Sequence, residues 1–453
     1  MNSIVRKFKK LLLIGGDIAA LYLALVLTLY VRYGQEWLTE WPKHSYPFTL
    51  IFALSLLVFY IIGLYDLNVA RNNLYFFITL GKAILVNAAL SVAFFYFIPY
   101  LGITPKTNLF LDMVFFAILL VLWRQFYNYA VKAPVLLNNV MIIGQSQEAK
   151  ELAQFIKDNP QLGYRVKKII KPEDAKMLTD LIELIVQEKI KIIVTSVNPA
   201  KDLDLVKNLY QCIPLKVIVA DLPRFYENLT GKVPVSVIEE VWFLENLMTD
   251  RKSLFEATKR LTDLFLAAIL GAATLILGPI IALAIKATSP GPIFFKQKRV
   301  GHDNKIFEAI KFRSMYALAP DGSAEKNGAQ WTKEKDSRVT PVGRYIRKTR
   351  LDELPQVWNV IKNEMSFVGP RPERPEFAFS NELLSQIPFY QVRHSIKPGL
   401  TGWAQIKYPY GSSIPDTMQK LQYDLYYIKN RSFLLDLAII LKTIKTILSG
   451  GGR

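Results

Sequence analysis

Apolar residues gather in four long segments in the first third of the chain. These segments lie at about 11–31, 47–65, 82–101 and 108–127. Each is close to the roughly 20 residues that a helix needs to cross a bilayer. Lysine and arginine are concentrated before the first segment and after the fourth, so the positive-inside rule places both ends of this predicted bundle in the cytoplasm. Asp17 lies inside the first segment, where a charge is unfavourable, and we expect it to face neighbouring helices as a structural polar contact.

The pattern of polar and apolar positions changes at about residue 138. Short β-branched runs, such as NNVMIIG and LKVIVADL, alternate with helical stretches such as EAKELAQFIKD up to about residue 245. This alternation predicts a small, parallel, Rossmann-like α/β module. The first strand ends at Gly144, but the second and third glycines of a dinucleotide-binding turn are missing. We therefore interpret the module as a regulatory or oligomerisation unit.

A further apolar run of about 22 residues lies between Asp263 and Lys286, and basic residues flank it on both sides. Gly278-Pro279 interrupts this run. Because a proline inside a helix removes a hydrogen bond and bends the helix, the pattern favours a broken, re-entrant helix over 261–287. A fifth straight span stays open as the alternative, since hydropathy does not separate the two.

The predicted fold class is an integral membrane α-helical bundle joined to a cytoplasmic α/β module and a small α-rich catalytic domain with a re-entrant membrane helix. The bundle is expected over 1–135, the α/β module over 136–248 and the catalytic domain over 249–453.

The composition favours a membrane over a nucleic acid as the partner. The 453 residues carry a net charge of +18, and 51% of them are hydrophobic. A chain that is both basic and apolar suits the anionic inner face of a membrane, so we expect inner-membrane lipids and no nucleic acid as partners. Cys212 is the only cysteine, which excludes an intramolecular disulfide and a thiolate metal site. With three histidines a zinc site is not expected either, so a metal would be a hard ion such as Mg²⁺ held by oxygen.

Two adjacent acids, Asp352 and Glu353, stand in a basic segment of the last third of the chain. Asp352 could simply cap the helix that begins ELPQVWNVIK, and the two acids alone do not indicate catalysis. Arg350 and other basic residues precede them, however, and VGPRPERPE follows. We expect this basic cluster to lower both carboxylate pKa values and to keep both acids ionised. Carboxylates that attack phosphorus or hold magnesium, and arginines that bind phosphate oxygens, are the parts of a phosphoryl-transfer site.

Several ordered motifs closely resemble the bacterial sugar transferase family, the polyprenyl-phosphate hexose-1-phosphate transferases. The motifs are ATSPGPIFFKQKRVG, IFEAIKFRSM, RKTRLDELPQVWNVIKNEMSFVGPRPE and IKPGLTGWAQI. The amino-terminal spans and the α/β module resemble the layout of the long, polytopic branch, which initiates exopolysaccharide, capsule and O-antigen synthesis. The resemblance implies transfer of a sugar 1-phosphate from a UDP-hexose to undecaprenyl phosphate, with release of UMP, at the cytoplasmic face of the bacterial inner membrane. It also implies a homodimer.

The same resemblance implies roles for individual residues. Asp352 is expected to be the nucleophile that forms a covalent phosphosugar intermediate, and Glu353 to bind Mg²⁺. The membrane helix is expected to bend at Gly278 and Pro279, where the family has Ser-Pro. The residues expected to bind phosphate, from the resemblance or from their charge, are Lys311, Arg313, Arg350, Pro370, Arg371, Pro372 and Arg299.

Two other functions stay open. A membrane-bound nucleotide-sugar dehydratase also joins four spans to an α/β domain, but Gly144 lacks the accompanying glycines that such an enzyme needs. A non-catalytic scaffold of a polysaccharide assembly complex would tolerate a degenerate site, whereas both acids are present here. The sequence does not indicate which hexose is transferred.

Overall fold

We describe the fold from a computed structural model of the chain. The structure describes residues 2–98, 106–133, 137–176, 178–196, 202–247, 253–319, 323–324, 336–408, 411 and 413–448. The chain divides into two compact units, Met1–Phe225 and Tyr226–Arg453. Residues 226–247, which the sequence assigns to the α/β module, thus fall in the second unit. The predicted boundaries at 135 and 248 lie outside the described residues, and the three-domain division stays a prediction.

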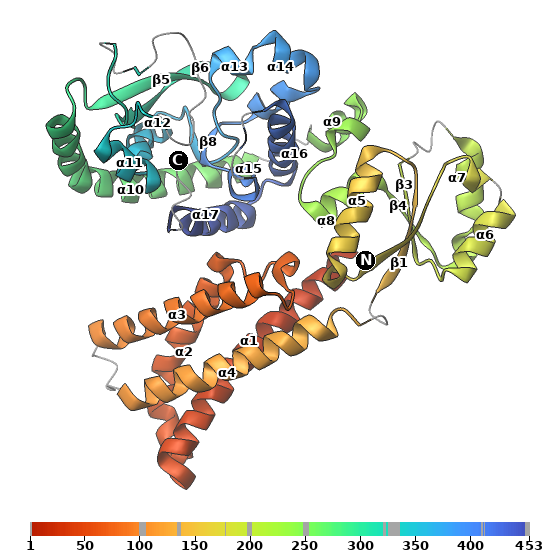
Figure 1. Cartoon of the computed structure of the whole chain (residues 1–453), viewed down its shortest axis with the longest axis horizontal. Helices are drawn as coiled ribbons and strands as arrows, with labels where there is room; N and C mark the ends of the chain where they lie inside the picture. Colours follow the sequence, from red (N-terminus) through yellow and green to blue (C-terminus); the bar gives the residue numbers. More distant parts are fainter. Residues whose placement is uncertain are drawn as a thin grey trace. The chain divides into compact units, whose positions relative to one another are not determined.

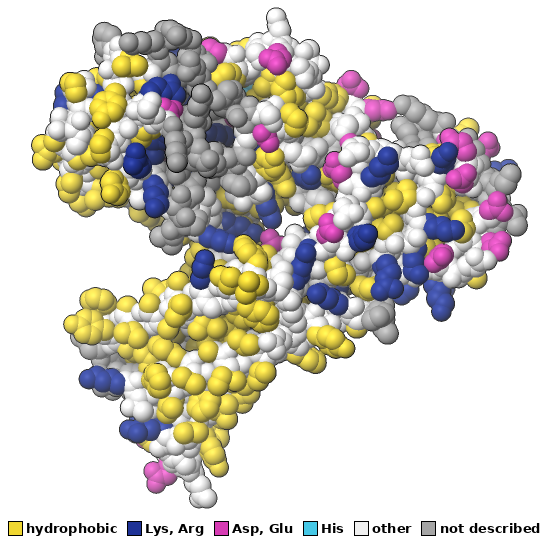
Figure 2. Space-filling view, viewed as in Figure 1, with side chains coloured by type: hydrophobic (Ala, Val, Ile, Leu, Met, Phe, Trp, Pro, Cys, Tyr) yellow, Lys and Arg dark blue, Asp and Glu magenta, His cyan; other side chains and the backbone are white. Residues whose placement is uncertain are grey.

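The first unit begins with long apolar helices, as the hydropathy pattern predicts. These are α1 (Asn2–Tyr33), α2 (Trp37–Ile62), α3 (Leu74–Phe97) and α4 (Lys106–Ala130). By length and composition, four segments of the described chain could cross a membrane: Arg6–Ile62, Leu74–Phe97, Lys106–Ala130 and Leu254–Thr288. Figure 2 shows hydrophobic side chains over the outer surface of α1–α4, which is the surface that lipid would cover. The end of the predicted third segment, 99–101, lies outside the described residues.

A buried ion pair holds α1 against α4. Arg124 Nε donates to Asp17 Oδ1 over 3.0 Å, and Arg124 Nη1 donates to Leu64 O over 2.8 Å. Both charged side chains are fully buried. The prediction that Asp17 faces other helices is therefore confirmed, because a buried charge is tolerated when it is paired and hydrogen-bonded.

The rest of the first unit is a four-stranded parallel sheet with strand order β2-β1-β3-β4, which confirms the predicted strand–helix alternation. The Rossmann-like assignment stays a prediction. Its elements are β1 (Asn138–Ile143), α5 (Gln147–Asp158), β2 (Tyr164–Ile170), α6 (Leu178–Gln187), β3 (Ile192–Thr195), α7 (Leu203–Gln211) and β4 (Ile218–Asp221). Gly144 follows β1 at φ +130°, and a Cβ there would lie 1.8 Å from Ser196 Oγ. The single glycine of this turn is thus required by the close approach of Ser196.

The second unit contains helices around two small sheets (Figure 1). Strands β5 (Phe294–Val300) and β6 (Ile306–Phe312) form an antiparallel hairpin, whereas β7 (Ser366–Val368) and β8 (Gly399–Thr401) pair in parallel. The helices that matter for the site are α10 (Ser253–Thr288), α11 (Pro341–Lys348), α12 (Val357–Ile361), α16 (Ile414–Asn430) and α17 (Phe433–Leu448). The core of this unit collects buried side chains from α10, α12, β7 and α16, including Ala267, Val360, Val368 and Leu425.

Helix α10 is the apolar run in which the sequence predicts a break. The structure has one helix of 36 residues with Pro279 inside it, so the helix bonding continues past the proline instead of breaking there. The ribbon curves towards its C-terminal end (Figure 1). Ala267 in its first half packs into the main core, while Ile281 and Ile285 in its second half pack on Phe312 and Ile346. Both halves are thus held by the same unit, and the outward face between them is apolar and exposed.

Candidate active site

The two acids, Asp352 and Glu353, lie on a short 3-10 helix, η10 (Leu351–Gln356), directly after α11. Arg350 adopts a left-handed conformation at φ +55° and reverses the chain between the two helices. The Glu353 N–H donates to Arg350 O over 3.1 Å. Leu351 and Leu354 pack against the cluster that contains Phe312 of β6. This packing fixes the two carboxylates beside strand β6.

Three cations surround the Glu353 carboxylate. Lys311 Nζ lies 2.7 Å from Oε1, Arg371 Nη2 lies 3.8 Å from Oε1, and Arg350 Nη1 lies 3.6 Å from Oε2. Burial by itself would raise the pKa of Glu353, but the charges of Lys311, Arg371 and Arg350 outweigh it and hold the pKa well below its usual range. Arg350 precedes Glu353 by three residues, whereas Lys311 lies 42 residues before it in the chain. The fold brings these two cations and Arg371 together at the acids, and their phosphate-binding role stays a prediction.

Asp352 has a different environment. Its side chain is buried, and its carboxylate forms no hydrogen bond or ion pair with any residue that the structure describes. Burial and the charge of Glu353 raise the pKa of Asp352 to about 6, against an ordinary value of 3.8. The expectation that the basic cluster lowers both pKa values is therefore wrong for Asp352, because the nearest cation pairs with Glu353 instead. At neutral pH Asp352 is still ionised, because the charges of Lys311, Arg347 and Arg350 offset part of the cost of burying its charge.

The Pro370-Arg371-Pro372 segment follows β7, and its backbone is held at every residue. Pro370 O accepts from Gly399 N over 2.9 Å, Arg371 O from Arg393 Nη2 over 3.2 Å, and Pro372 O from Arg299 Nη1 over 2.9 Å. The Arg371 side chain is 39% exposed, so a rigid backbone presents a half-exposed guanidinium. This arrangement can bind a phosphate group with little loss of backbone entropy.

Glycines allow the β7 and β8 segments to approach closely. A Cβ on Gly399 would lie 2.1 Å from Gly369 N, and a Cβ on Gly402 would lie 2.2 Å from Gly369 O. No side chain fits between these backbones. The GPRP and KPGLTGW motifs therefore form one structural unit, in which the second motif supports the first.

Arg299 of β5 lies against the Pro-Arg-Pro segment. Burial and the neighbouring charge of Arg371 lower the pKa of Arg299 to about 10, so this side chain stays protonated at neutral pH. Its placement beside Arg371 agrees with the predicted position at the phosphate site, although one of its nitrogens is already bonded to Pro372 O.

Arg313 is used elsewhere in the structure. Its buried guanidinium donates to Ser289 O over 2.8 Å and also to Pro290 O, at the end of α10. It forms no ion pair with Glu353. The Arg313 side chain thus binds the end of α10, and a phosphate-binding role for it stays a prediction.

Gly278 and Pro279 lie on α10, where a Cβ on Gly278 would contact Phe312 at 3.6 Å.

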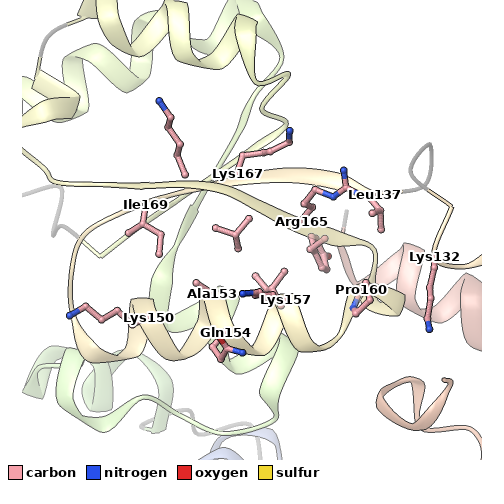
Figure 3. Close-up of a pocket in the computed structure, with 14 residues that line it drawn as sticks. Lys132, Leu137, Lys150, Ala153, Gln154, Lys157, Pro160, Arg165, Lys167 and Ile169 are labelled. Atoms are coloured by element: carbon pink, nitrogen blue, oxygen red, sulfur yellow. The ribbon is translucent and has the colours of Figure 1, made fainter. Parts of the chain in front are cut away.

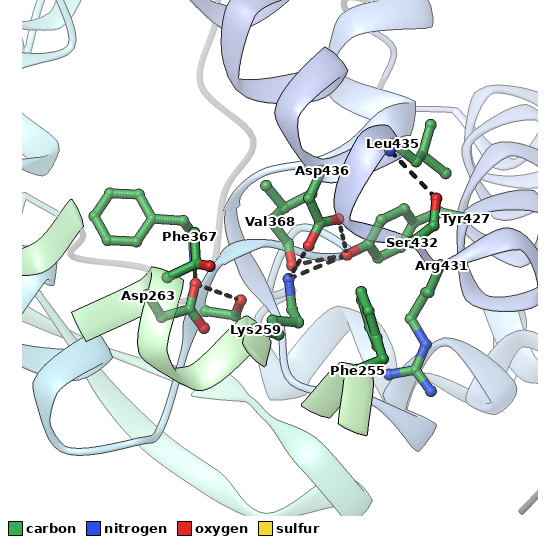
Figure 4. A network of polar contacts seen from close by, with 12 residues as sticks. Phe255, Lys259, Asp263, Phe367, Val368, Tyr427, Arg431, Ser432, Leu435 and Asp436 are labelled. Carbon is green, nitrogen blue, oxygen red and sulfur yellow. Dashed lines mark hydrogen bonds and ion pairs between the residues drawn. The ribbon is translucent and has the colours of Figure 1, made fainter. Parts of the chain in front are cut away.

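A second polar network ties α10 to the strand that leads into Pro-Arg-Pro (Figure 4). Lys259 Nζ lies 2.6 Å from Asp436 Oδ2, and the Tyr427 hydroxyl lies 2.7 Å from Asp436 Oδ1. Asp263 Oδ1 accepts hydrogen bonds from Ser366 Oγ and Phe367 N, both over 3.0 Å. α10, α17 and β7 are therefore locked together by buried charges.

The sequence reasoning missed one buried charged network. Arg393 Nη2 lies 2.7 Å from Asp424 Oδ2, and Arg393 Nη1 donates to the Tyr390 hydroxyl over 2.8 Å. The same guanidinium holds Arg371 O, so it supports the phosphate-binding segment from behind. Its sequence signal is faint, because Arg393 and Asp424 are single charges that lie far apart in the chain.

The donor set for a metal ion is small. Among the described residues, no group of three or more histidine, cysteine or acidic side chains could hold a metal ion. The Asp352 and Glu353 carboxylates are the oxygen donors that the site offers. Mg²⁺ is usually bound by one or two carboxylates together with substrate phosphates and water, so these residues fit such an ion.

Comparisons with known proteins match the carboxy-terminal unit most strongly. The family model described as "Bacterial sugar transferase" matches residues 254–450. A UDP-N-acetylgalactosamine-undecaprenyl-phosphate N-acetylgalactosaminephosphotransferase of Aeromonas hydrophila is 41% identical over 54% of this chain and 55% of its own length. An undecaprenyl-phosphate glucose phosphotransferase of Komagataeibacter xylinus is 34% identical over 68% of this chain and 59% of its own length. The alignments thus span little more than half of these two relatives.

Other relatives are covered more fully. A UDP-glucose:undecaprenyl-phosphate glucose-1-phosphate transferase of Xanthomonas campestris pv. campestris is 32% identical over 72% of this chain and 70% of its own length. That alignment is too long to fit within the carboxy-terminal unit alone, so the similarity extends beyond the segment that carries the two acids. By these similarities the chain belongs to the bacterial sugar transferase family.

Proposed function

We propose that this protein transfers a sugar 1-phosphate from a UDP-hexose to undecaprenyl phosphate and releases UMP, with Asp352 carrying the phosphosugar between the two half-reactions. The observation that carries the proposal is the buried Asp352 carboxylate, which has no hydrogen bond or ion pair to a described residue, while Lys311 pairs with the adjacent Glu353. The names of the relatives, which act on undecaprenyl phosphate, support the lipid acceptor and the sugar nucleotide donor.

In the first half-reaction, an Asp352 oxygen attacks the phosphorus that bears the sugar. A bond forms between that oxygen and phosphorus, the phosphorus–oxygen bond to the nucleotide breaks, and UMP leaves with the electron pair. In the second half-reaction, a phosphate oxygen of undecaprenyl phosphate attacks the same phosphorus. The bond to Asp352 breaks, the carboxylate is regenerated, and the product is undecaprenyl diphosphate sugar. Binding one substrate after the other in this way predicts ping-pong kinetics.

The surrounding side chains serve the charge that develops on phosphate. Arg371 on its fixed backbone, with Arg299 beside it, neutralises the phosphate oxygens. Lys311 keeps Glu353 ionised and so preserves the local field around Asp352. Mg²⁺, bound by Glu353 and substrate phosphate, would supply further neutralisation of the diphosphate.

A lipid substrate and a soluble one have to meet at one surface. Both halves of α10 pack on the same unit, and the outward face between them exposes apolar residues such as Phe265, Leu275 and Leu283. We propose that α10 enters the cytoplasmic leaflet of the inner membrane and returns, since a straight span would separate two ends that contact one polar unit. The acids would then stand at headgroup depth, where a polyprenyl phosphate carries its charge.

The test uses membranes that contain the full chain, undecaprenyl phosphate, Mg²⁺ and a panel of UDP-sugars that includes glucose, galactose and N-acetylgalactosamine. We expect one sugar to release UMP and to form a labelled lipid. With radiolabelled donor and no acceptor, the wild type should retain label on the protein, and Asp352→Asn should not. Release of UMP without any protein-bound label would contradict the covalent step, and formation of a keto-sugar would favour the dehydratase alternative.

A further inference from the structure

The α/β module carries a basic pocket that the proposed reaction does not use. The pocket lies between helix α5 and strand β2 and has a volume of about 750 Å³. The residues that line it include Lys150, Gln154 and Lys157 of α5 and Arg165 and Lys167 of β2. In Figure 3 the α5 residues lie below the strand, and the Lys167 side chain points away from the helix. Ligand pockets in proteins commonly have volumes of about 300–1,000 Å³, so the space suits a small ligand or a headgroup.

The charge of this pocket has one sign. Six basic residues line it, and none of the lining residues that the structure describes is acidic; they are Lys132, Lys150, Lys157, Arg165, Lys167 and Lys168. Lys167 lies 3.2 Å from Glu188. The other five form no ion pair with a described residue. The pocket therefore has uncompensated positive charge that an anion would neutralise.

Protection of a sheet edge does not explain all of these cations. Strand β2 is an edge strand, and lysines on edge strands prevent pairing with other chains. Lys150 and Lys157, however, come from α5, and Lys132 comes from the segment that follows α4. Cations from three parts of the chain thus line one pocket.

The floor of the pocket is apolar. Leu137, Ile156 and Tyr164 are buried and line it beneath the charged rim. A ligand that combines a phosphate with an apolar part matches this arrangement better than a fully hydrated inorganic ion does.

The pocket also lies at the membrane end of its unit. Lys132 stands two residues after the end of α4. The loop between α5 and β2 is fastened to the helical bundle, because Lys9 Nζ donates to Gln161 O over 3.3 Å and Gln161 Nε2 donates to Asn68 O over 3.2 Å. Basic residues at such a position lie where the anionic headgroups of the inner leaflet are found.

We propose that the pocket between α5 and β2 binds the phosphate headgroup of an anionic membrane lipid. The cations of α5 and β2 hold the phosphate, the apolar floor contacts the start of the acyl chains, and the lipid fixes the α/β module against the bilayer.

The experiment titrates the purified full chain in detergent with phosphatidylglycerol or with phosphatidylcholine of the same acyl chains, and counts bound lipids by native mass spectrometry. The wild type should bind phosphatidylglycerol in preference to phosphatidylcholine. The triple variant K150Q/K157Q/R165Q should weaken phosphatidylglycerol binding by about tenfold or more. The matched control K191Q/K207Q/K216Q removes three exposed cations of the same module outside the pocket and should bind like the wild type.

Two outcomes would overturn the proposal. Equal losses in the triple variant and in the control would show general surface attraction without a site. Inorganic phosphate or UDP could also displace phosphatidylglycerol at concentrations that leave phosphatidylcholine binding unchanged. That result would show that the ligand of the pocket is soluble. A photoactivatable phosphatidylglycerol provides a second measurement in the wild type, which should be labelled on α5 or β2; labelling confined to α1–α4 would also refute the site.

Discussion

Replacing Asp352 by asparagine separates the chemical role of this residue from its effect on stability. Asparagine has nearly the same shape but cannot become a nucleophilic carboxylate. We expect turnover to fall by at least about a thousandfold, because removal of a covalent nucleophile leaves only binding and electrostatic contributions. The same substitution should stabilise the folded protein, which is unusual for a change at a buried polar position.

The expected stabilisation follows from the pKa of Asp352. This pKa rises from 3.8 to about 6 on folding, because burial and Glu353 disfavour the charged form. At about 1.36 kcal/mol per unit, an ionised Asp352 destabilises the fold by on the order of 3 kcal/mol. The folded state holds its proton more tightly, so the stability of the wild type falls as the pH rises from 3.8 towards 6, and the full penalty is present above 6.

The assay compares thermal unfolding and UMP release for the wild type and the variant. At neutral pH the melting temperature of Asp352→Asn should be several degrees higher, and the difference should disappear well below pH 3.8, where the carboxyl group is protonated in both states. Wild-type turnover should decline as the pH falls below about 6, because the nucleophile becomes protonated. Asp303→Asn, which changes an exposed acid in the loop between β5 and β6, should alter neither quantity. Normal turnover in Asp352→Asn, or a lower melting temperature at neutral pH, would refute the reasoning.

Three further substitutions, one of them with a matched control, test the supporting contacts. Lys311→Met leaves the buried Glu353 with less compensating charge, so we expect a loss of about 3–5 kcal/mol in unfolding free energy and of most UMP release; unchanged turnover would speak against its role. Lys259→Met breaks the buried ion pair with Asp436 and should lower the unfolding free energy by a similar amount. Its control, Lys296→Gln, removes an exposed ion pair and should change the unfolding free energy by less than about 1 kcal/mol in the same thermal unfolding series. Equal effects of these two variants would show that burial does not decide the outcome. Gly399→Ala places a Cβ 2.1 Å from the backbone nitrogen of Gly369, which should force the two segments apart. Limited proteolysis should then show early cleavage near Pro-Arg-Pro. Protease resistance equal to that of the wild type would contradict the packing argument.

Local patterns in the sequence determined most of the elements. Apolar segments of bilayer length became α1–α4 and the long helix α10, and alternating β-branched and helical stretches became a parallel sheet. These features depend on residues that are near in the chain, so a short window contains the information. The motifs around Asp352 and Arg371 also indicated the candidate site, because both lie in one short stretch of the sequence.

The sequence did not predict how the charges at the site are shared. Several basic residues of the segment and its neighbours could have paired with either acid. Only the fold brings Lys311 of β6 to within 2.7 Å of Glu353 and leaves the Asp352 carboxylate without a hydrogen bond or ion pair to a described residue. Likewise, Arg313 follows Lys311 by two residues, yet its side chain holds the end of α10. Arg313 follows the last residue of β6, so the strand alternation that would place it beside Lys311 no longer applies to it.

The chain by itself therefore determined that the protein is membrane-embedded, that a parallel α/β module follows the bundle, and that two acids and a Pro-Arg-Pro element belong together. Only the tertiary structure decided that Glu353 holds the cations, that Asp352 is buried with a raised pKa, and that a basic pocket forms between α5 and β2. The physical reason is that burial and Coulomb interactions depend on distances between residues far apart in the sequence, whereas hydropathy and helix or strand periodicity are properties of neighbouring residues.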